Sequence, residues 1–167
     1  MTDERAPSGR RVGWGFDAHR LNTEPPLVLG GVVVSEEIGV DATSDGDVLA
    51  HAVTDALLGA CAGGDIGEHF PSTDPAMVDT NSLFFVRQAA TMAMAWGWRP
   101  VHVDTTVVAE EVRISPHKDD IRAGLAEALG MPIDDVSVKA TSTDGLGFIG
   151  RGEGLAAVAV ITVEALP

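Results

Sequence analysis

The chain has 167 residues, of which 45% are hydrophobic, and this fits one globular domain with a buried core. Its 11 lysines and arginines against 25 aspartates and glutamates give a formal net charge of −14. This charge argues against nucleic acid and against an anionic membrane as partners, because both require a basic surface. It also means that an anionic substrate would need divalent cations or local basic groups.

The single cysteine, Cys61, allows no disulfide within the chain, which favours a reducing compartment. Residues 1–10 lack the apolar segment of a signal peptide, and we expect them to form a disordered tail before a single domain at 11–167. No apolar stretch is long enough to span a membrane. These features together predict a soluble, cytoplasmic protein.

The first half of the chain predicts two β elements and a helix. Residues 11–17 are typical of a strand, and the two apolar runs around Gly30 and Gly31 are typical of a hairpin. Apolar residues at i, i+3, i+4 and i+7 predict an amphipathic helix over 46–62. Ser44 or Asp45 would cap its start, and the glycine pair 63–64 would end it.

The second half alternates helices and strands. Residues 82–96 are apolar almost all round and predict a largely buried helix, which is followed by a strand over 99–111. Helical spacing between Pro116 and Gly130 predicts another helix, and a short strand over 134–140 and a glycine-rich loop over 141–154 come next. The last strand is apolar on both faces. Helices can cover one face, and either a neighbouring subunit or the monomer itself covers the other.

Two groups of potential metal ligands lie in the predicted first strand and first helix. Asp17 and His19 share one face of the strand, because alternate side chains point the same way. Asp47, His51 and Asp55 are spaced i, i+4, i+8 and form one stripe opposite the apolar one. Asp17, His19 and His51 would give three protein ligands and one open position, as in working zinc sites. A solvated helix face explains the same stripe without a metal.

Two polar loops could complete a site. Residues 64–75 begin where the helix ends and could fold back over it, although such a loop is usually a surface connection. The segment "KATSTDGLGF" places Lys139, Ser142 and Asp144 at a strand end, where hydroxyls, a lysine and free N–H groups could hold phosphate. A turn rich in small polar residues is the alternative. The short "SDGD" segment is not a calcium loop, because the helical pattern begins almost at once.

Three segments together resemble the signature blocks of one enzyme family. They are "GWGFDAHRL", "SDGDVLAHAVTDALLGACAGGDIGEHFPSTDP" and "VKATSTDGLGFIGRGEGLAA". In this order and spacing the chain resembles the 2-C-methyl-D-erythritol 2,4-cyclodiphosphate synthases. The resemblance implies an α+β fold, with a single mixed or antiparallel sheet and helices on one face. It also implies a chorismate-mutase-like homotrimer in which the sheets pack around the threefold axis and the active sites lie between subunits.

The resemblance implies a lyase reaction of the non-mevalonate (MEP) route of isoprene biosynthesis. The substrate would be 4-diphosphocytidyl-2-C-methyl-D-erythritol 2-phosphate. Its 2-phosphate attacks the β-phosphate, CMP leaves, and the cyclic diphosphate forms. The implied cofactors are Zn²⁺ and a second divalent ion, Mg²⁺ or Mn²⁺.

The resemblance also assigns roles to individual residues. Asp17, His19 and His51 would bind zinc, and Asp55 would either orient a ligand histidine or bind the sugar. Asp144, which stands where the family usually has a glutamate, would help to hold the second ion, and Ser142 or Thr143 would contact the phosphates. Phe148 and Arg151 resemble residues that line the central cavity of the trimer, where isoprenoid diphosphates have been proposed to bind. The remaining implied substrate contacts are Ser44, Asp65, Ile66, Gly67, Phe70, Asp74, Ala109, Arg113, Lys139, Ala140 and Thr141.

The chain departs from the family pattern at two positions. Thr43 stands where the family commonly has a histidine, and Ser72 where it often has an aspartate. We expect activity to survive with a weaker hold on the substrate. Two alternatives remain open: a non-catalytic metal-binding trimer that senses isoprenoid diphosphates, and a metal-dependent phosphohydrolase.

Overall fold

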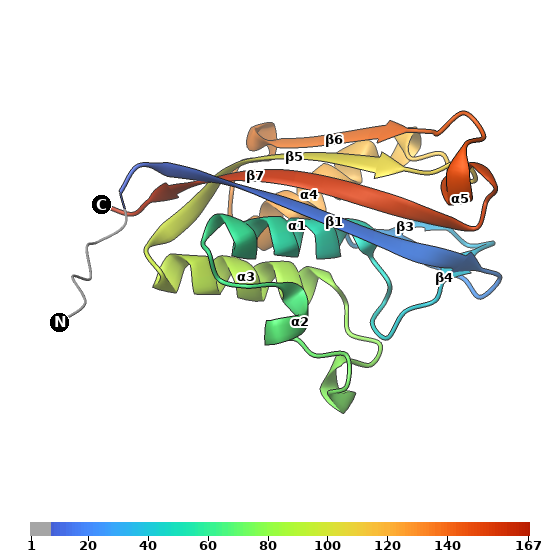
Figure 1. Ribbon diagram of the computed structural model, residues 1–167. Coiled ribbons are helices and arrows are strands. Elements are labelled where there is room, and N and C mark those ends of the chain that lie inside the picture. Colours follow the sequence, from blue (N-terminus) through green and yellow to red (C-terminus); the bar gives the residue numbers. More distant parts are fainter. Residues whose placement is uncertain (1–7) are drawn as a thin grey trace.

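The computed structural model describes residues 8–167, which form one main sheet with helices packed against it (Figure 1) and a separate two-stranded sheet made by the hairpin around Gly30 and Gly31. The strands are β1 (Arg10–Asn22), β2 (Leu27–Leu29), β3 (Val32–Ser35), β4 (Gly39–Val40), β5 (Trp98–Val108), β6 (Val136–Thr141) and β7 (Gly154–Ala165). The helices are α1 (Val48–Ala60), α2 (Ile66–His69), α3 (Leu83–Ala95), α4 (Lys118–Leu129) and α5 (Gly147–Gly150). Three 3₁₀ turns, Pro75–Met77, Ser115–His117 and Ile133–Asp135, lie between them.

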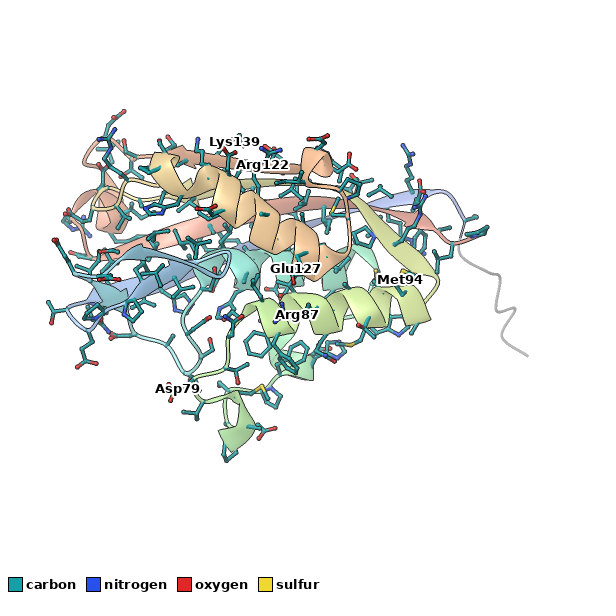
Figure 2. All side chains as sticks on the ribbon, turned by 180° about the vertical axis from the view of Figure 1, so that it is seen from behind. Asp79, Arg87, Met94, Arg122, Glu127 and Lys139 are labelled. Atoms are coloured by element: carbon teal, nitrogen blue, oxygen red, sulfur yellow. The ribbon has the colours of Figure 1, made fainter. Side chains whose placement is uncertain are left out.

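The main sheet has the strand order β4-β1-β7-β5-β6. Strand β7 pairs antiparallel with both β1 and β5, whereas β5 and β6 pair in parallel. A parallel pair needs a crossover connection, and α4 supplies it. Arg122 on α4 donates to the carbonyl oxygens of Val136 (2.8 Å) and Ile133 (3.0 Å), which ties this helix to the edge of the sheet beside Lys139 (Figure 2).

Helices α1, α3 and α4 all lie on one face of the sheet, as Figure 1 shows. The expected α+β architecture with a mixed sheet covered on one face is therefore confirmed. The other face is bare in this chain and carries apolar side chains from β1 and β7. Trp14 is 63% exposed there and stacks on Phe16 at a ring distance of 6.1 Å, with Val12 and Val160 beside them.

Helix α1 lies unusually close to β1, because two glycines of the strand face it. A Cβ atom added at Gly13 would lie 1.8 Å from the carbonyl oxygen of Ala56, and one at Gly15 would lie 2.0 Å from that of Ala52. No side chain fits between the two backbones. The strand therefore places its helix-facing side chains directly beside α1, which matters for Asp17 and His19.

Several element boundaries differ from the sequence predictions. The predicted tail, 1–10, falls largely outside the described residues, but Arg10 already belongs to β1, where it pairs with Glu164 of β7. The first strand runs to Asn22 rather than residue 17, and the loop predicted over 141–154 contains the short helix α5. Helix α3 is buried on one side only, since Phe84 and Met94 are 37% and 47% exposed. No helix among the described residues is long and apolar enough to cross a membrane.

The predicted caps of α1 were wrong. The N-cap is Asp47, whose side chain accepts the backbone N–H groups of Leu49 and Ala50 and also that of Gly31. Asp47 is fully buried and belongs to this cap rather than to an exposed stripe with His51. Burial raises the pKa of Asp47 to about 6, although the N–H groups of Ala50 and Gly31 act in the opposite direction. At the other end, the left-handed position after the helix is Ala62, not a glycine.

Candidate active site

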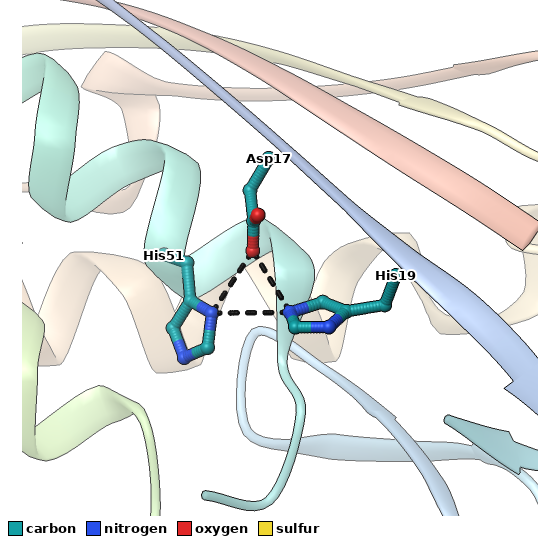
Figure 3. A group of neighbouring side chains, drawn as sticks. All are labelled: Asp17, His19 and His51. Atoms are coloured by element: carbon teal, nitrogen blue, oxygen red, sulfur yellow. Dashed lines mark hydrogen bonds and ion pairs between the residues drawn. The ribbon is translucent and has the colours of Figure 1, made fainter. Parts of the chain in front are cut away.

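Asp17, His19 and His51 converge at the contact between β1 and α1 (Figure 3). The Oδ2 atom of Asp17 lies 2.9 Å from Nε2 of His19 and 2.9 Å from Nδ1 of His51. The two ring nitrogens lie 3.3 Å apart. The potential ligand atoms of the three residues all lie within 4.8 Å of one another, so the predicted set comes together in the folded chain.

Local structure places each member of this set. The alternation of β1 turns residues 13, 15, 17 and 19 towards the helices. Gly15 lets α1 approach, and His51 lies in the first turn of α1, where its backbone N–H donates to the carbonyl oxygen of Asp47. The close contact of two backbones thus sets the distance between the strand ligands and the helix ligand.

The hydrogen-bond partners of the two histidines fit a metal site. Nδ1 of His19 lies 3.2 Å from the carbonyl oxygen of Asp41, which can only accept, so this nitrogen carries the proton. Nε2 of His51 faces the hydroxyl of Ser82 at 2.9 Å. The nitrogens that face Asp17 are then free to offer lone pairs. Three acceptors directed at one point repel one another unless a cation lies between them, and one carboxylate with two imidazoles suits zinc.

The pKa values of Asp17 and His19 show that the three side chains influence one another. Burial raises the pKa of Asp17, but the hydrogen bonds and charges of His19 and His51 outweigh it, and the net effect is a pKa well below the usual range. Burial lowers the pKa of His19, but the bond to Asp17 outweighs it and the pKa is raised. Protons and a cation therefore compete for the same nitrogen and oxygen lone pairs.

Both histidines open into a cavity of about 220 Å³. Four predicted substrate contacts line it, Ser44, Ile66, Gly67 and Phe70, and so do the two departures from the family pattern, Thr43 and Ser72. The loop after α1 does fold back beside the two histidines. Three further lining residues, Ala42, Met77 and Phe85, were not predicted.

Three predicted aspartates serve as supports for this loop. Asp55 accepts the backbone N–H of Ile66 at 2.8 Å, so its hydrogen bond goes to the loop and not to a histidine. Asp65 caps α2 by accepting the N–H of Glu68, and Asp74 accepts that of Ala76. These bonds fix the backbone that forms one wall of the cavity.

The second predicted site region surrounds Asp144. The carboxylate of Glu110 accepts the N–H groups of Thr143 (2.8 Å) and Gly145 (3.1 Å) and the Thr143 hydroxyl (3.1 Å). These bonds lower the pKa of Glu110. They hold Asp144 in a left-handed conformation (φ 51°), which is uncommon for a residue other than glycine. Ser142 lies beside it, with Oγ 3.4 Å from Oδ1 of Asp144.

The remaining predicted residues lie around this region and on the far edge of the sheet. Lys139 forms an ion pair with Asp104 at 2.6 Å, and Arg151 pairs with Glu153 at 2.8 Å. Phe148, on α5, lines a shallow hollow with His19 and Arg20. The cavity beside the two histidines is not lined by Ala109, Arg113 or residues 139–144.

Two regions expected to act together are therefore separated within one chain. β7 and β5 lie between β1, which carries Asp17 and His19, and β6, which leads to Ser142. Three strand spacings amount to about 14 Å. The histidines face the helices, whereas Lys139 extends from the bare face with Asp104.

Sequence reasoning missed Glu110 and Ser82. Glu110 gave no signal, because its partners are 33 and 35 residues away. Ser82 precedes a helix and has the signature of an N-cap, but its side chain makes no capping bond. Both act through contacts that only the folded chain creates.

Comparison with known proteins gives one consistent result. Residues 10–164 match the model of the YgbB family. The 2-C-methyl-D-erythritol 2,4-cyclodiphosphate synthase of Syntrophomonas wolfei is 49% identical over 154 residues, covering 92% of this chain and 98% of that protein. The bifunctional IspDF of Campylobacter jejuni superposes with a TM-score of 0.92 at 37% identity, over 95% of this chain and 43% of that one. The IspF–CDP complex of Plasmodium falciparum gives 0.84 at 29% identity, over 96% and 99%. The chain therefore belongs to the YgbB family, which includes these cyclodiphosphate synthases.

Proposed function

We propose that Asp17, His19 and His51 hold one zinc ion and that the protein uses this site as a cyclodiphosphate synthase, a CMP-forming lyase of the MEP pathway. The convergence of three lone-pair donors at one point, open to a cavity, carries the proposal. Full-length relatives with this activity support it. The substrate is 4-diphosphocytidyl-2-C-methyl-D-erythritol 2-phosphate.

In this reaction an oxygen of the 2-phosphate forms a bond to the β-phosphorus while the bond from that phosphorus to CMP breaks. The nucleophile is already anionic, so no residue has to act as a strong base. The main obstacle is repulsion between two phosphates, about 1 kcal/mol per pair of unit charges at 4 Å in water and about 4 near a protein surface. When bound, a zinc ion supplies positive charge that offsets this repulsion. Asp17, His19 and His51 fix the position of that charge and need not transfer a proton.

The cavity beside the histidines suits the methylerythritol part of the substrate. Backbone groups of Ile66 and Gly67 and the apolar ring of Phe70 form one wall, held in place by Asp55, Asp65 and Asp74. Thr43 and Ser44, which carry small hydroxyl groups, also line the cavity. Holding the sugar here restricts the flexible chain that joins the two phosphates, and such positioning can contribute several kcal/mol.

The cytidine and the diphosphate would be bound by a neighbouring chain of a homotrimer. Ala109, Arg113, Lys139, Ala140, Thr141, Ser142 and Thr143 form that pocket, with Asp144 beside Mg²⁺ or Mn²⁺ on the diphosphate. Two observations support this arrangement. Strand β6, which carries Lys139, Ala140 and Thr141, lies three strand spacings, about 14 Å, from β1 of its own chain. The bare face of the sheet also exposes Trp14, Phe16 and Val12, which packing against other sheets would bury. In the trimer, Phe148 and Arg151 would line the central cavity.

Product identification tests this function. The protein is incubated with the cytidyl substrate, Zn²⁺ and Mg²⁺, and the products are analysed by mass spectrometry and phosphorus NMR. We expect equimolar CMP and cyclic diphosphate, and loss of both after complete chelation. Inorganic phosphate or a linear product would indicate a phosphohydrolase instead. Zinc binding without any turnover would indicate the non-catalytic sensor.

A further inference from the structure

Ser82 stands at the N-cap of α3 but does not cap it. A serine at this position usually accepts a backbone N–H of the first helical turn. Here the side chain is fully buried and its oxygen contacts a carboxylate oxygen of Asp45, Nε2 of His51 at 2.9 Å and, more weakly, the hydroxyl of Ser44 at 3.3 Å. The hydroxyl therefore does not cap the helix and instead contacts a ligand of the proposed metal site.

The direction of these hydrogen bonds follows from the donors available. The Ser82 hydroxyl donates a hydrogen bond to a carboxylate oxygen of Asp45, which accepts it. The second oxygen of Asp45 accepts the backbone N–H of Ser82 at 2.9 Å, which fixes the serine at two points. The lone pairs of the Ser82 oxygen then remain to accept from His51. The proton of His51 is thereby held on Nε2, and Nδ1 faces Asp17 and His19 with its lone pair.

Backbone pairing makes this arrangement rigid. The N–H of Asp45 donates to the carbonyl oxygen of Thr80 at 3.1 Å, and that of Asp79 donates to Thr43 at 3.0 Å. The segment before α1 and the segment before α3, 37 residues apart, are thus held side by side at the wall of the cavity. Ser44 is a weaker alternative acceptor for His51, because its oxygen is 3.2 Å from Nε2 and also accepts the N–H of Gly46.

We infer that Ser82, oriented by Asp45, is a positioning residue of the metal site, which fixes the ring orientation and the tautomer of His51 from outside the coordination sphere. The inference rests on the zinc site proposed above. It goes beyond that proposal, because it assigns a function to two residues that bind neither metal nor substrate. The corresponding nitrogen of His19 is served by a backbone carbonyl, so the side chain that serves His51 is the one that substitution can remove.

The test compares zinc affinity and the visible spectrum of the Co²⁺-substituted protein in Ser82→Ala, Ser82→Thr and Thr54→Val. Ser82→Ala is expected to raise the zinc dissociation constant by about 10- to 100-fold and to change the Co²⁺ absorption bands, because the ring loses its acceptor. Ser82→Thr keeps the hydroxyl and should recover most of the affinity. Thr54→Val is the control: it removes another fully buried hydroxyl, bonded to the carbonyl oxygen of Ala50 on the same helix, and should leave both readouts unchanged.

The possible results distinguish a failure of the Ser82 inference from a failure of the proposed function. Folded Ser82→Ala with the zinc affinity and Co²⁺ spectrum of the parent would overturn the inference, as would an equal loss in Thr54→Val. If Ser82→Ala does not fold, Asp45→Asn keeps the size of the side chain but changes the group that orients Ser82, and it should weaken zinc binding in the same direction. An unchanged affinity in that variant would also refute the inference. A parent protein that binds no zinc would refute the proposed function itself.

Discussion

Gly15 controls the distance between the strand that carries Asp17 and His19 and the helix that carries His51. In Gly15→Ala, the new Cβ atom would lie 2.0 Å from the carbonyl oxygen of Ala52 and 2.6 Å from the backbone nitrogen of Ala56. Real Cβ atoms keep at least 3.0 Å from such atoms, so the helix and the strand must separate by about 1 Å. Both neighbours are backbone atoms, and no side chain can rotate away to relieve the contact.

A separation of this size affects stability and metal binding together. Overpacking a well-packed contact costs about 1–3 kcal/mol of the free energy of unfolding. Metal sites tolerate shifts of only about 0.2 Å in ligand distances, and we expect the zinc dissociation constant of Gly15→Ala to rise at least about tenfold. Urea unfolding and competition with a chelating dye measure the two effects.

Gly59→Ala is the matched control, because Gly59 lies on α1 with no atom within 4 Å of its added Cβ. This variant should keep the zinc affinity of the parent and gain up to about 1 kcal/mol of stability, since alanine favours a helix more than glycine does. If Gly15→Ala kept both the stability and the zinc affinity of the parent, the account of how β1 and α1 position the site would be refuted.

Three further predictions concern pH, assembly and the diphosphate pocket. The pKa of His19 is raised above 6.5, and below that raised value its proton competes with zinc. Zinc affinity should therefore be highest above the raised pKa and fall as the pH is lowered through it. A dissociation constant that does not change between pH 8 and pH 5.5 would contradict this. Trp14→Glu places a charge on the bare sheet face and should yield monomers in analytical ultracentrifugation. Val33→Glu, at an exposed apolar site on β3, is the control and should leave the expected trimer intact. A trimer in both variants would argue against an interface on the bare face. Glu110→Ala removes the acceptor that holds the loop around Asp144. Steady-state kinetics should show a raised KM, and the zinc affinity should not change. An unaltered KM would show that this loop does not need the support of Glu110.

The elements and the grouping of Asp17, His19 and His51 could be predicted because they depend on local patterns. The alternation of β1 placed Asp17 and His19 on one face, and the helical phase placed His51 away from the core. A solvated helix face explained the same spacing, and it was the resemblance that assigned the three residues to zinc. The same reasoning failed for Asp47, because a carboxylate four residues before His51 can equally be an N-cap. Only the folded chain shows that Asp47 is fully buried and accepts the backbone N–H of Gly31.

Contacts between distant segments could not be predicted. Asp55 was expected to serve a histidine or the sugar, but its bond to Ile66 depends on how the loop after α1 turns back. The pairing of Asp45 with Ser82 and of Glu110 with Thr143 joins residues more than 30 positions apart, and no periodicity encodes such pairs. Strand order could not be predicted either, and it separates β6, which leads to Ser142, from Asp17 and His19 of the same chain.

The central claim is that one zinc ion is bound by these three side chains through defined atoms. Anomalous diffraction at the zinc absorption edge, from crystals of the protein grown with Zn²⁺, tests it most directly. We predict one strong peak per chain at about 2.0–2.2 Å from Oδ2 of Asp17, Nε2 of His19 and Nδ1 of His51. A peak bound elsewhere, or bound to Nε2 of His51 with the ring reversed, would contradict the account.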